Sequence, residues 1–258
     1  MKITALAENT SCLSSIGCEH GLSLYIEAVG HRILFDMGQT DLFAKNAEKL
    51  DVDLSAVDIA VLSHGHYDHG GGLETFLSVN AAAPVYLHSN AFEPHFNGTE
   101  KYIGLNPALQ NNNRLYFTGE EQVIADGVTL YACNTKQKYE DFGSGNLSVL
   151  RHHKLLPDDF VHEQYLLIEE NGKRILVSGC SHKGILNILE WFRPDYLIGG
   201  FHFMKLECSD RLKADAGRMA AYDTVYYTCH CTGQEQYAFM KPFVERLHYL
   251  SAGQTVYI

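Results

Sequence analysis

The chain has 258 residues, of which 46% are hydrophobic and 20% charged, so it is long enough to bury a sizeable core. Its formal charge of −11 argues against an extended nucleic acid as a partner, because phosphate contacts need a basic face. It has no apolar run of membrane-spanning length, no signal-peptide pattern and an odd number of cysteines. These features favour a cytoplasmic chain with reduced thiols and no membrane partner.

Short apolar runs rich in Val, Ile and Tyr recur along the chain and predict strands. In chain order they cover residues 22–27, 33–36, 59–62, 85–87, 128–132, 165–168, 175–177, 196–198, 225–228 and 255–258. Helix-period stretches lie at 41–50, 73–79, 185–192, 212–221 and 234–247, the last interrupted by Pro242. The polar stretch 96–146 is the best candidate for irregular loops over a site, with strands within 116–132. This mixture predicts an α/β fold whose helices cover the outer faces of sheets.

Three imidazoles and a carboxylate follow the predicted strand 59–62 within one short glycine-bracketed loop: His64, His66, Asp68 and His69. Glycines let such a loop fold back so that side chains two residues apart can converge. Gathering these groups without a metal would cost desolvation and repulsion with no compensation. The loop therefore predicts a metal site.

The loop sequence HGHYDHGGG resembles the H-x-H-x-D-H signature of the metallo-β-lactamase superfamily. The segments GQTDLFAKNAEKL, HEQ, GCSHKGILNIL, IGGFH and HCTG occur in the order of one branch. That branch is labelled 7,8-dihydropterin-6-yl-methyl-4-(β-D-ribofuranosyl)aminobenzene 5′-phosphate synthase-like. The resemblance implies a single domain over residues 1–258, folded as a four-layer αββα sandwich with two mixed sheets and helices outside.

The resemblance also implies ligand roles. His64 and His66 are expected to bind one metal ion, and Asp68 and His69 a second one. His230, after the strand 225–228, is the expected third protein ligand of the second metal.

For the first metal, the resemblance favours His162, just before the strand 165–168, as the third ligand. His152 and His153 adjoin Lys154 and fit a solvated turn instead. Asp36 follows an early strand, where the family has an Asp-containing turn that braces the metal loop.

Cys180 departs from the pattern, because most of the superfamily has a metal-bridging Asp at this position. A thiolate can ligate zinc, so Cys180 is a candidate ligand of the second metal, and its alternative role is a small buried apolar residue. If the bridge is lost, His182 substitutes or the second metal is weak or absent. His182 is otherwise a proton donor or a substrate contact, and His202 is expected to face the substrate. Cys229 and Cys231 are interpreted as packing thiols.

These features favour a hydrolase with one or two divalent metal ions per chain, Zn first, with Fe or Mn as alternatives. A metal-bound hydroxide, formed near neutral pH, would attack the substrate while Asp68 orients it and His182 or His202 protonates the leaving group. The favoured substrate is a small anionic phosphoester or phosphodiester, pterin- or nucleotide-like. Aromatic residues available to stack such a ring are Tyr102, Tyr116, Phe117, Tyr139 and Phe142.

Three alternatives remain from the sequence. The first is a thioester or lactone hydrolase. The second is a diiron redox enzyme, which Cys180 and the lack of a flavin domain disfavour. The third is a metal-binding sensor without turnover. Oligomeric state is not addressed by any pattern.

Overall fold

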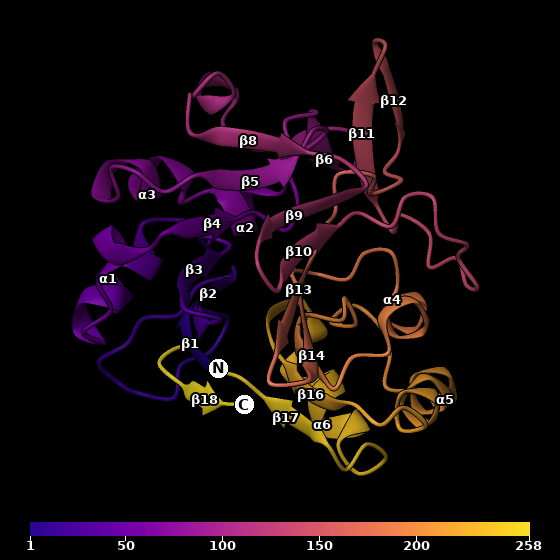
Figure 1. The fold of residues 1–258 in the computed structure, drawn as a ribbon. Helices are drawn as coiled ribbons and strands as arrows, with labels where there is room; N and C mark the ends of the chain where they lie inside the picture. Colours follow the sequence, from indigo (N-terminus) through magenta and orange to yellow (C-terminus); the bar gives the residue numbers. More distant parts are fainter.

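Two seven-stranded sheets lie face to face at the centre of the structure, a computed structural model that describes residues 1–258 (Figure 1). The two chain ends lie side by side at one edge of this sandwich, where the amino group of Met1 donates to the carbonyl oxygen of Ile258.

The first sheet takes most of its strands from the N-terminal half of the chain. Its order is β18 (Thr255–Tyr257), β1 (Lys2–Ala7), β2 (Ser23–Ala28), β3 (His31–Phe35), β4 (Ile59–Val61), β5 (Val85–His88) and β8 (Leu115–Thr118). Strands β18 to β3 are antiparallel neighbours, whereas β3, β4, β5 and β8 run parallel. The carboxyl ends of β3 and β4 therefore lie at the same edge of the sheet.

The second sheet comes from the C-terminal half and is also mixed. Its order is β17 (Leu247–Tyr249), β16 (Val225–Thr228), β15 (Tyr196–Gly199), β14 (Lys173–Ser178), β13 (Tyr165–Glu170), β10 (Val128–Tyr131) and β9 (Glu121–Ala125). Strands β14 to β17 are parallel and the others antiparallel. The strands β14, β15 and β16 thus also end at a common edge.

Aliphatic side chains from both sheets meet in one core between them. This core contains Ile26 and Ile33 from the first sheet and Leu166 and Val177 from the second, all at most 1% exposed. Full burial of one such side chain contributes roughly 1.5–3 kcal/mol, so the contact between the sheets is the main source of stability for the sandwich.

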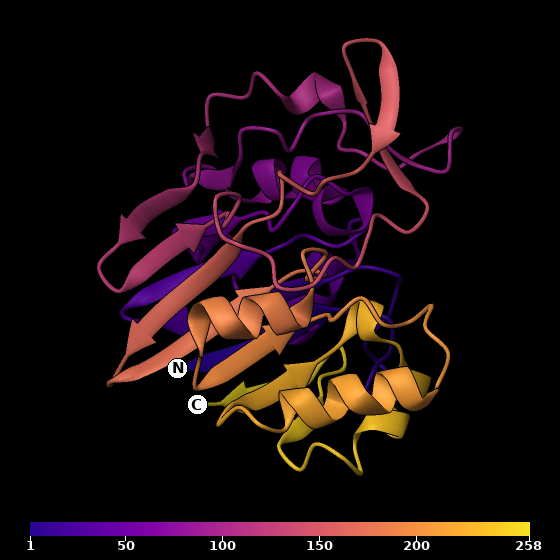
Figure 2. The ribbon, with the colours of Figure 1, turned by 90° about the vertical axis from the view of Figure 1, so that its right-hand side faces the viewer.

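Helices cover the outer face of each sheet. The helices α1 (Leu42–Lys49) and α3 (Leu73–Val79) pack on the first sheet, where Phe43 and Phe76 are buried. The helices α4 (Ile185–Phe192), α5 (Asp210–Met219) and α6 (Gln234–Met240) pack on the second (Figure 2). The predicted four-layer αββα sandwich is confirmed.

The helix predictions agree with α1, α3 and α4 to within one residue. The prediction for α5 lies two residues too far along the chain. The helix α6 ends at Met240, two residues before Pro242, because proline has no N–H to continue the backbone ladder.

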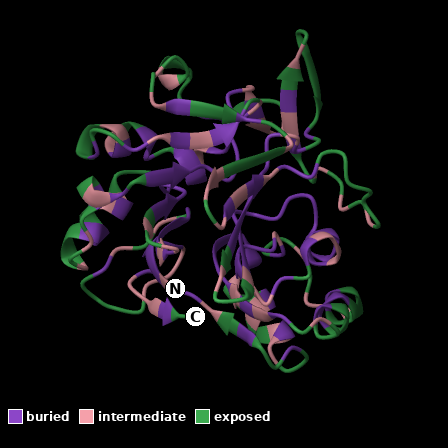
Figure 3. Ribbon diagram, in the orientation of Figure 1, coloured by how far each residue is buried: buried purple, intermediate pink, exposed green.

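A small third sheet lies beside the sandwich and was not predicted. Its order is β12 (Lys154–Pro157), β11 (Leu147–Arg151), β6 (His95–Asn97) and β7 (Lys101–Tyr102). The hairpin β11–β12 projects outward (Figure 1) and is exposed along β12 (Figure 3), and its turn carries His152 and His153. The stretch 96–146 is thus less irregular than expected, and only 132–146 lacks helix and strand throughout. No helix is long and apolar enough to cross a membrane.

Candidate metal centre

Loops at the carboxyl ends of five strands meet between the two sheets. Asp36 follows β3, the loop of His64 to His69 follows β4, and Cys180 with His182 follows β14. His202 and His230 follow β15 and β16. The short helix α2 (Tyr67–Gly70) and the 3₁₀ turn η3 (His230–Thr232) lie within these loops. The predicted convergence of strand ends is therefore present.

Four predicted metal ligands gather around His69, and we call Asp68, His69, Cys180 and His230 the His69 cluster. The Nε2 atom of His69 lies 3.2 Å from Cys180 Sγ and 3.2 Å from His230 Nε2. Asp68 Oδ2 lies 3.4 Å from His230 Nε2 and 3.9 Å from His69 Nε2. Ligands around a tetrahedral zinc are separated by roughly 3.3–3.8 Å, given its usual bond lengths. Both the donor types and their spacing fit a divalent cation.

Hydrogen bonds behind this cluster fix which ring nitrogen faces it. The Asp36 carboxylate accepts from His69 Nδ1 at 2.7 Å and from the backbone N–H and hydroxyl of Ser63, each also at 2.7 Å. His230 Nδ1 lies 2.9 Å from Asn9 Oδ1. An imidazole that donates from Nδ1 presents the lone pair of Nε2, which is the form that binds a metal. Asp36 is thus placed as the predicted brace.

The cluster also has the electrostatics of a cation site. Burial lowers the pKa of His69, but Asp36 and Asp68 outweigh it and raise that pKa to about 9. Burial raises the pKa of Asp68, yet His69, His20 and His230 hold it well below its ordinary value. Two buried carboxylates beside a thiol therefore demand positive charge, which a proton on His69 or a metal ion can supply.

A second group, the His64 cluster, consists of His64, His66 and His182. One ring nitrogen from each lies within 4.8 Å of the other two, and His64 Nε2 is 3.3 Å from His182 Nε2. Ser63 Oγ donates to Asp36 and lies 2.8 Å from His64 Nδ1, so the Nε2 lone pair of His64 faces the cluster. Burial and the neighbouring imidazoles lower the pKa of His64, which favours its neutral, ligating form.

Predicted ligand His162 lies in a different group. His95, Asp158 and His162 form what we call the Asp158 network, which His66 also contacts. Asp158 Oδ2 lies 2.7 Å from His95 Nδ1, 3.4 Å from His162 Nε2 and 3.9 Å from His66 Nε2. All four side chains are at most 5% exposed. His162 is therefore near the site but not in either of the two clusters.

His202 and Cys231 adjoin the His69 cluster from the second sheet. One donor atom from each lies within 4.8 Å of Cys180, and the backbone N–H of His202 points to Cys231 Sγ at 3.3 Å. The interpretation of Cys231 as a packing thiol turned away from the site is wrong, because residues 230–232 form a 3₁₀ turn and not an extended strand. Cys229, in contrast, is buried in the core between the sheets.

Backbone strain concentrates in these loops. Asp36, Ser181, His202 and His230 all have a positive φ between 49° and 59°. Such a conformation costs roughly 1–3 kcal/mol for a residue other than glycine and is typical of functional sites. At Gly65 a Cβ would lie 2.1 Å from the carbonyl oxygen of Ala91, so only glycine allows the metal loop its course.

A cavity of about 240 Å³ opens beside His182 and His202. Phe142, Phe160, Phe201 and Phe203 supply its aromatic wall, and Lys205 and Arg211 contribute two cations. Of the five aromatic residues proposed for stacking, only Phe142 lines this cavity. Tyr102, Tyr116, Phe117 and Tyr139 are each more than 40% exposed.

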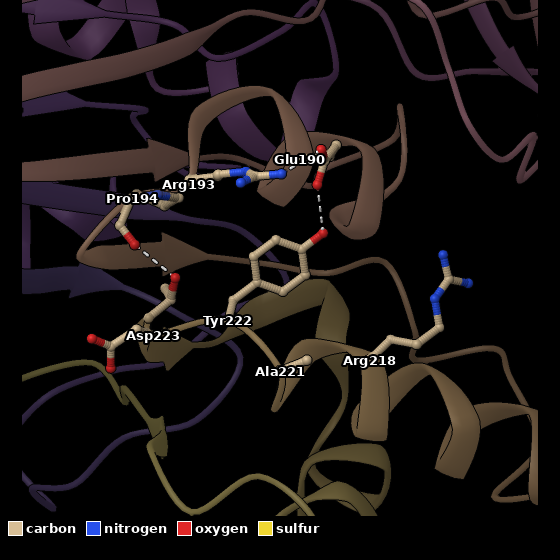
Figure 4. A pocket seen from close by; sticks show the side chains of 8 residues that line it. Glu190, Arg193, Pro194, Arg218, Ala221, Tyr222 and Asp223 are labelled. Carbon is tan, nitrogen blue, oxygen red and sulfur yellow. Dashed lines mark hydrogen bonds and ion pairs between the residues drawn. The ribbon is translucent and has the colours of Figure 1, made fainter.

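A larger cavity of about 590 Å³ lies near the ends of α4 and α5 (Figure 4). Its lining contains no histidine or cysteine, and its polar groups already pair with each other: Tyr222 donates to Glu190, which also pairs with Arg193. The donor chemistry of the strand-end loops is absent there, so size alone does not mark the functional site.

Comparison with known proteins agrees with this geometry. Residues 16–192 match the family model of the metallo-β-lactamase superfamily. The chain belongs to this superfamily. Over 286 aligned residues it is 28% identical to the 7,8-dihydropterin-6-methyl-4-(β-D-ribofuranosyl)-aminobenzene-5′-phosphate synthase of Methanocaldococcus jannaschii, covering 99% of this chain and 96% of the relative.

Solved structures share the fold. The crystal structure of Tm1679, described as a metal-dependent hydrolase of the β-lactamase superfamily, has a TM-score of 0.86 and 28% identity, covering 100% of this chain and 99% of that one. Zn²⁺-bound PqqB from Methylobacterium extorquens has a TM-score of 0.60 and 12% identity, with full coverage of both chains. The PqqB likeness concerns the fold alone.

Three residues near the site were not predicted. His20 Nε2 lies 3.3 Å from Asp68 Oδ2, and His95 and Asp158 form the network described above. His20 lies in an irregular loop, His95 begins a strand that was not predicted, and Asp158 precedes no recognised motif. The prolines and aspartates around Asp158 read as an ordinary turn, so no local signal distinguished it.

Proposed function

We propose that this chain is a metal-dependent hydrolase that cleaves small anionic esters, with phosphoesters and phosphodiesters as the favoured class. The observation that carries the proposal is the His69 cluster, whose nitrogen, oxygen and sulfur donors lie at ligand spacing with their backing hydrogen bonds in place. Superfamily membership supports the same reaction class.

In this proposal Asp68, His69, Cys180 and His230 hold one divalent cation, and His64 and His66 contribute to a second position. Thiolate and imidazole donors favour Zn, with Fe and Mn as alternatives. When bound, such a cation lowers the pKa of a water molecule towards about 7 and stabilises charge that develops on the substrate.

The chain's own residues orient the reactants. Asp68 is anionic beside His20 and His230, and it accepts a hydrogen bond from the attacking water. His202 lines the cavity and its Nδ1 atom has no hydrogen-bond partner, so it is placed to donate a proton to the leaving group. Asp36 holds the ring of His69 in place during this chemistry.

The cavity favours an anionic substrate with a flat ring. Lys205 and Arg211 supply positive charge at the rim of a chain whose formal charge is −11. Phe142 and Phe160 offer apolar surface against which a heterocycle can stack. A pterin- or nucleotide-like phosphoester combines both features.

The test is a substrate panel on the chain loaded in turn with Zn²⁺, Mn²⁺ and Fe²⁺. The panel contains p-nitrophenyl phosphate, bis-p-nitrophenyl phosphate, a thioester and a lactone. We expect metal-dependent release of nitrophenol that Asp68→Asn abolishes. Turnover of only the thioester or lactone would move the substrate class, and a metal-loaded chain with no turnover would leave a metal-binding sensor.

A synthase reaction is the second candidate. The M. jannaschii relative is named for the synthesis of a pterin-linked ribofuranosylaminobenzene phosphate, and the match covers 99% of this chain. A nucleophilic partner would then replace water in the same cavity. Hydrolysis of the phosphoester panel at a rate unaffected by added aminobenzene compounds would argue against this candidate.

A further inference from the structure

The identity of the third protein ligand in the His64 cluster depends on which way two imidazoles face. In His64, His69 and His230 the Nδ1 atom has a hydrogen-bonding partner behind the site, which leaves the Nε2 lone pair facing the donors. The same criterion can be applied to His162 and His182, the two remaining candidates.

His162 has the opposite arrangement. The backbone N–H of Gly65 donates to His162 Nδ1 at 2.9 Å. A backbone amide can only donate, so Nδ1 must carry the lone pair and the neutral ring carries its proton on Nε2. That Nε2 atom lies 3.4 Å from Asp158 Oδ2, where a proton is favourable. Ligation through Nε2 would put the proton on Nδ1, directly against the Gly65 N–H.

His182 meets the criterion instead. Its Nε2 atom lies 3.3 Å from His64 Nε2, the spacing of adjacent ligands on a tetrahedral ion, and its Nδ1 atom has no partner that fixes a proton elsewhere. Phe160 stacks on the ring with centroids 4.4 Å apart and planes 7° apart. The Glu163 carboxylate accepts from the backbone N–H of His182 at 2.7 Å, so the ring is held from two sides.

We propose that His182, and not His162, completes the metal position formed by His64 and His66, and that His162 supports the site through Asp158. The assignment rests on the proposed metal-dependent function and departs from the role that family resemblance implied for His162. It also removes His182 from the list of proton donors and leaves His202 for that role.

The experiment compares metal binding by full-length wild type, His182→Gln and the matched variant His162→Gln. Metal-free proteins are titrated with Co²⁺, and stoichiometry is measured by elemental mass spectrometry and by the ligand-field absorption of Co²⁺. Wild type and His162→Gln are expected to bind about two ions per chain, and His182→Gln about one. His182→Asp, which retains an oxygen ligand, should restore the second ion with a shifted absorption band. Circular dichroism of the metal-free proteins checks that all of them fold.

Loss of an ion from folded His162→Gln would overturn the assignment, as would retention of both ions by His182→Gln. The second result decides the matter even if His162→Gln does not fold. A chain with the expected stoichiometries but no ester turnover would overturn the proposed function and leave the ligand assignment standing. Ester turnover by a chain whose His182→Gln variant keeps both ions would do the reverse.

Discussion

The His69 cluster and the Asp158 network are made of the same kinds of residue and are similarly buried, but their carboxylates lie on opposite sides of the imidazoles. In the His69 cluster Asp36 lies behind the ring, bonded to Nδ1, and the Nε2 atom faces other donors. In the Asp158 network the carboxylate lies at the centre, and His95 and His162 direct ring nitrogens towards it.

This difference shows that ring orientation, more than residue type, separates a metal ligand from a supporting residue. A carboxylate behind a histidine makes it a better ligand, because it holds the proton on the far nitrogen. A carboxylate among the histidines competes for the position that an ion would take. The backbone amide of Gly65 enforces the second arrangement for His162.

The largest expected effect tests the first cluster directly. Asp68→Asn keeps the shape of the side chain but removes its charge beside His230 and His20. We expect kcat for a phosphoester to fall by roughly 10²- to 10⁴-fold, the range for loss of a positioned acid–base group. Asp159→Asn, which changes an exposed carboxylate paired with Arg151, is the matched control and should leave kcat unchanged. Equal rates for wild type and Asp68→Asn would remove Asp68 from the reaction.

A smaller effect separates the two carboxylates that the comparison places in front of and behind the rings. Asp36→Asn should weaken metal binding by roughly 10- to 100-fold, because His69 loses the acceptor that holds its proton on Nδ1. Asp158→Asn should weaken it less, because Asp158 lies 3.9 Å from His66 and makes its short contact with His95. Competition with a chromophoric chelator measures both affinities. Equal losses in the two variants would contradict the distinction between the groups.

Charge at the cavity rim should affect binding more than chemistry. Lys205→Ala and Arg211→Ala each remove an exposed cation, and an exposed ion pair is worth roughly 0.2–1 kcal/mol. The KM for an anionic ester should therefore rise by no more than about fivefold per variant, with kcat nearly unchanged and a smaller effect at high salt. Lys45→Ala, on α1 at the opposite face, is the control. A KM that does not change in either variant would place the substrate elsewhere.

Much of this molecule could be predicted from its sequence because the signals are local. The strands that carry the site end at glycines or histidines, and three helices agree with their periodic pattern to within one residue. The loop of His64 to His69 is recognisable because its ligands are only one or two residues apart. Cys180 and His230 were found because each follows a recognisable strand.

The rest depends on contacts between distant segments. Asp158 meets His95 across 63 residues, and neither position has a sequence feature that announces the pair. The orientation of His162 depends on a backbone amide 97 residues away. Ring orientation of this kind follows from tertiary structure, so the sequence could place His162 near the site but could not assign the direction of its nitrogens.

The smallest effect comes from His88, a buried histidine outside both groups, which shows what burial does without a carboxylate partner. Burial, with a contribution from Lys183, lowers the pKa of His88 to about 4. The unfolded chain takes up a proton on this ring below pH about 6.5 and the folded chain does not, so folding stability falls as the pH drops from 7 to 5. Urea unfolding of the metal-free protein should show a loss about 1 kcal/mol larger in wild type than in His88→Asn over this interval. An equal loss in both proteins would mean that the folded chain accepts the proton at His88, and that burial alone does not keep an imidazole neutral here.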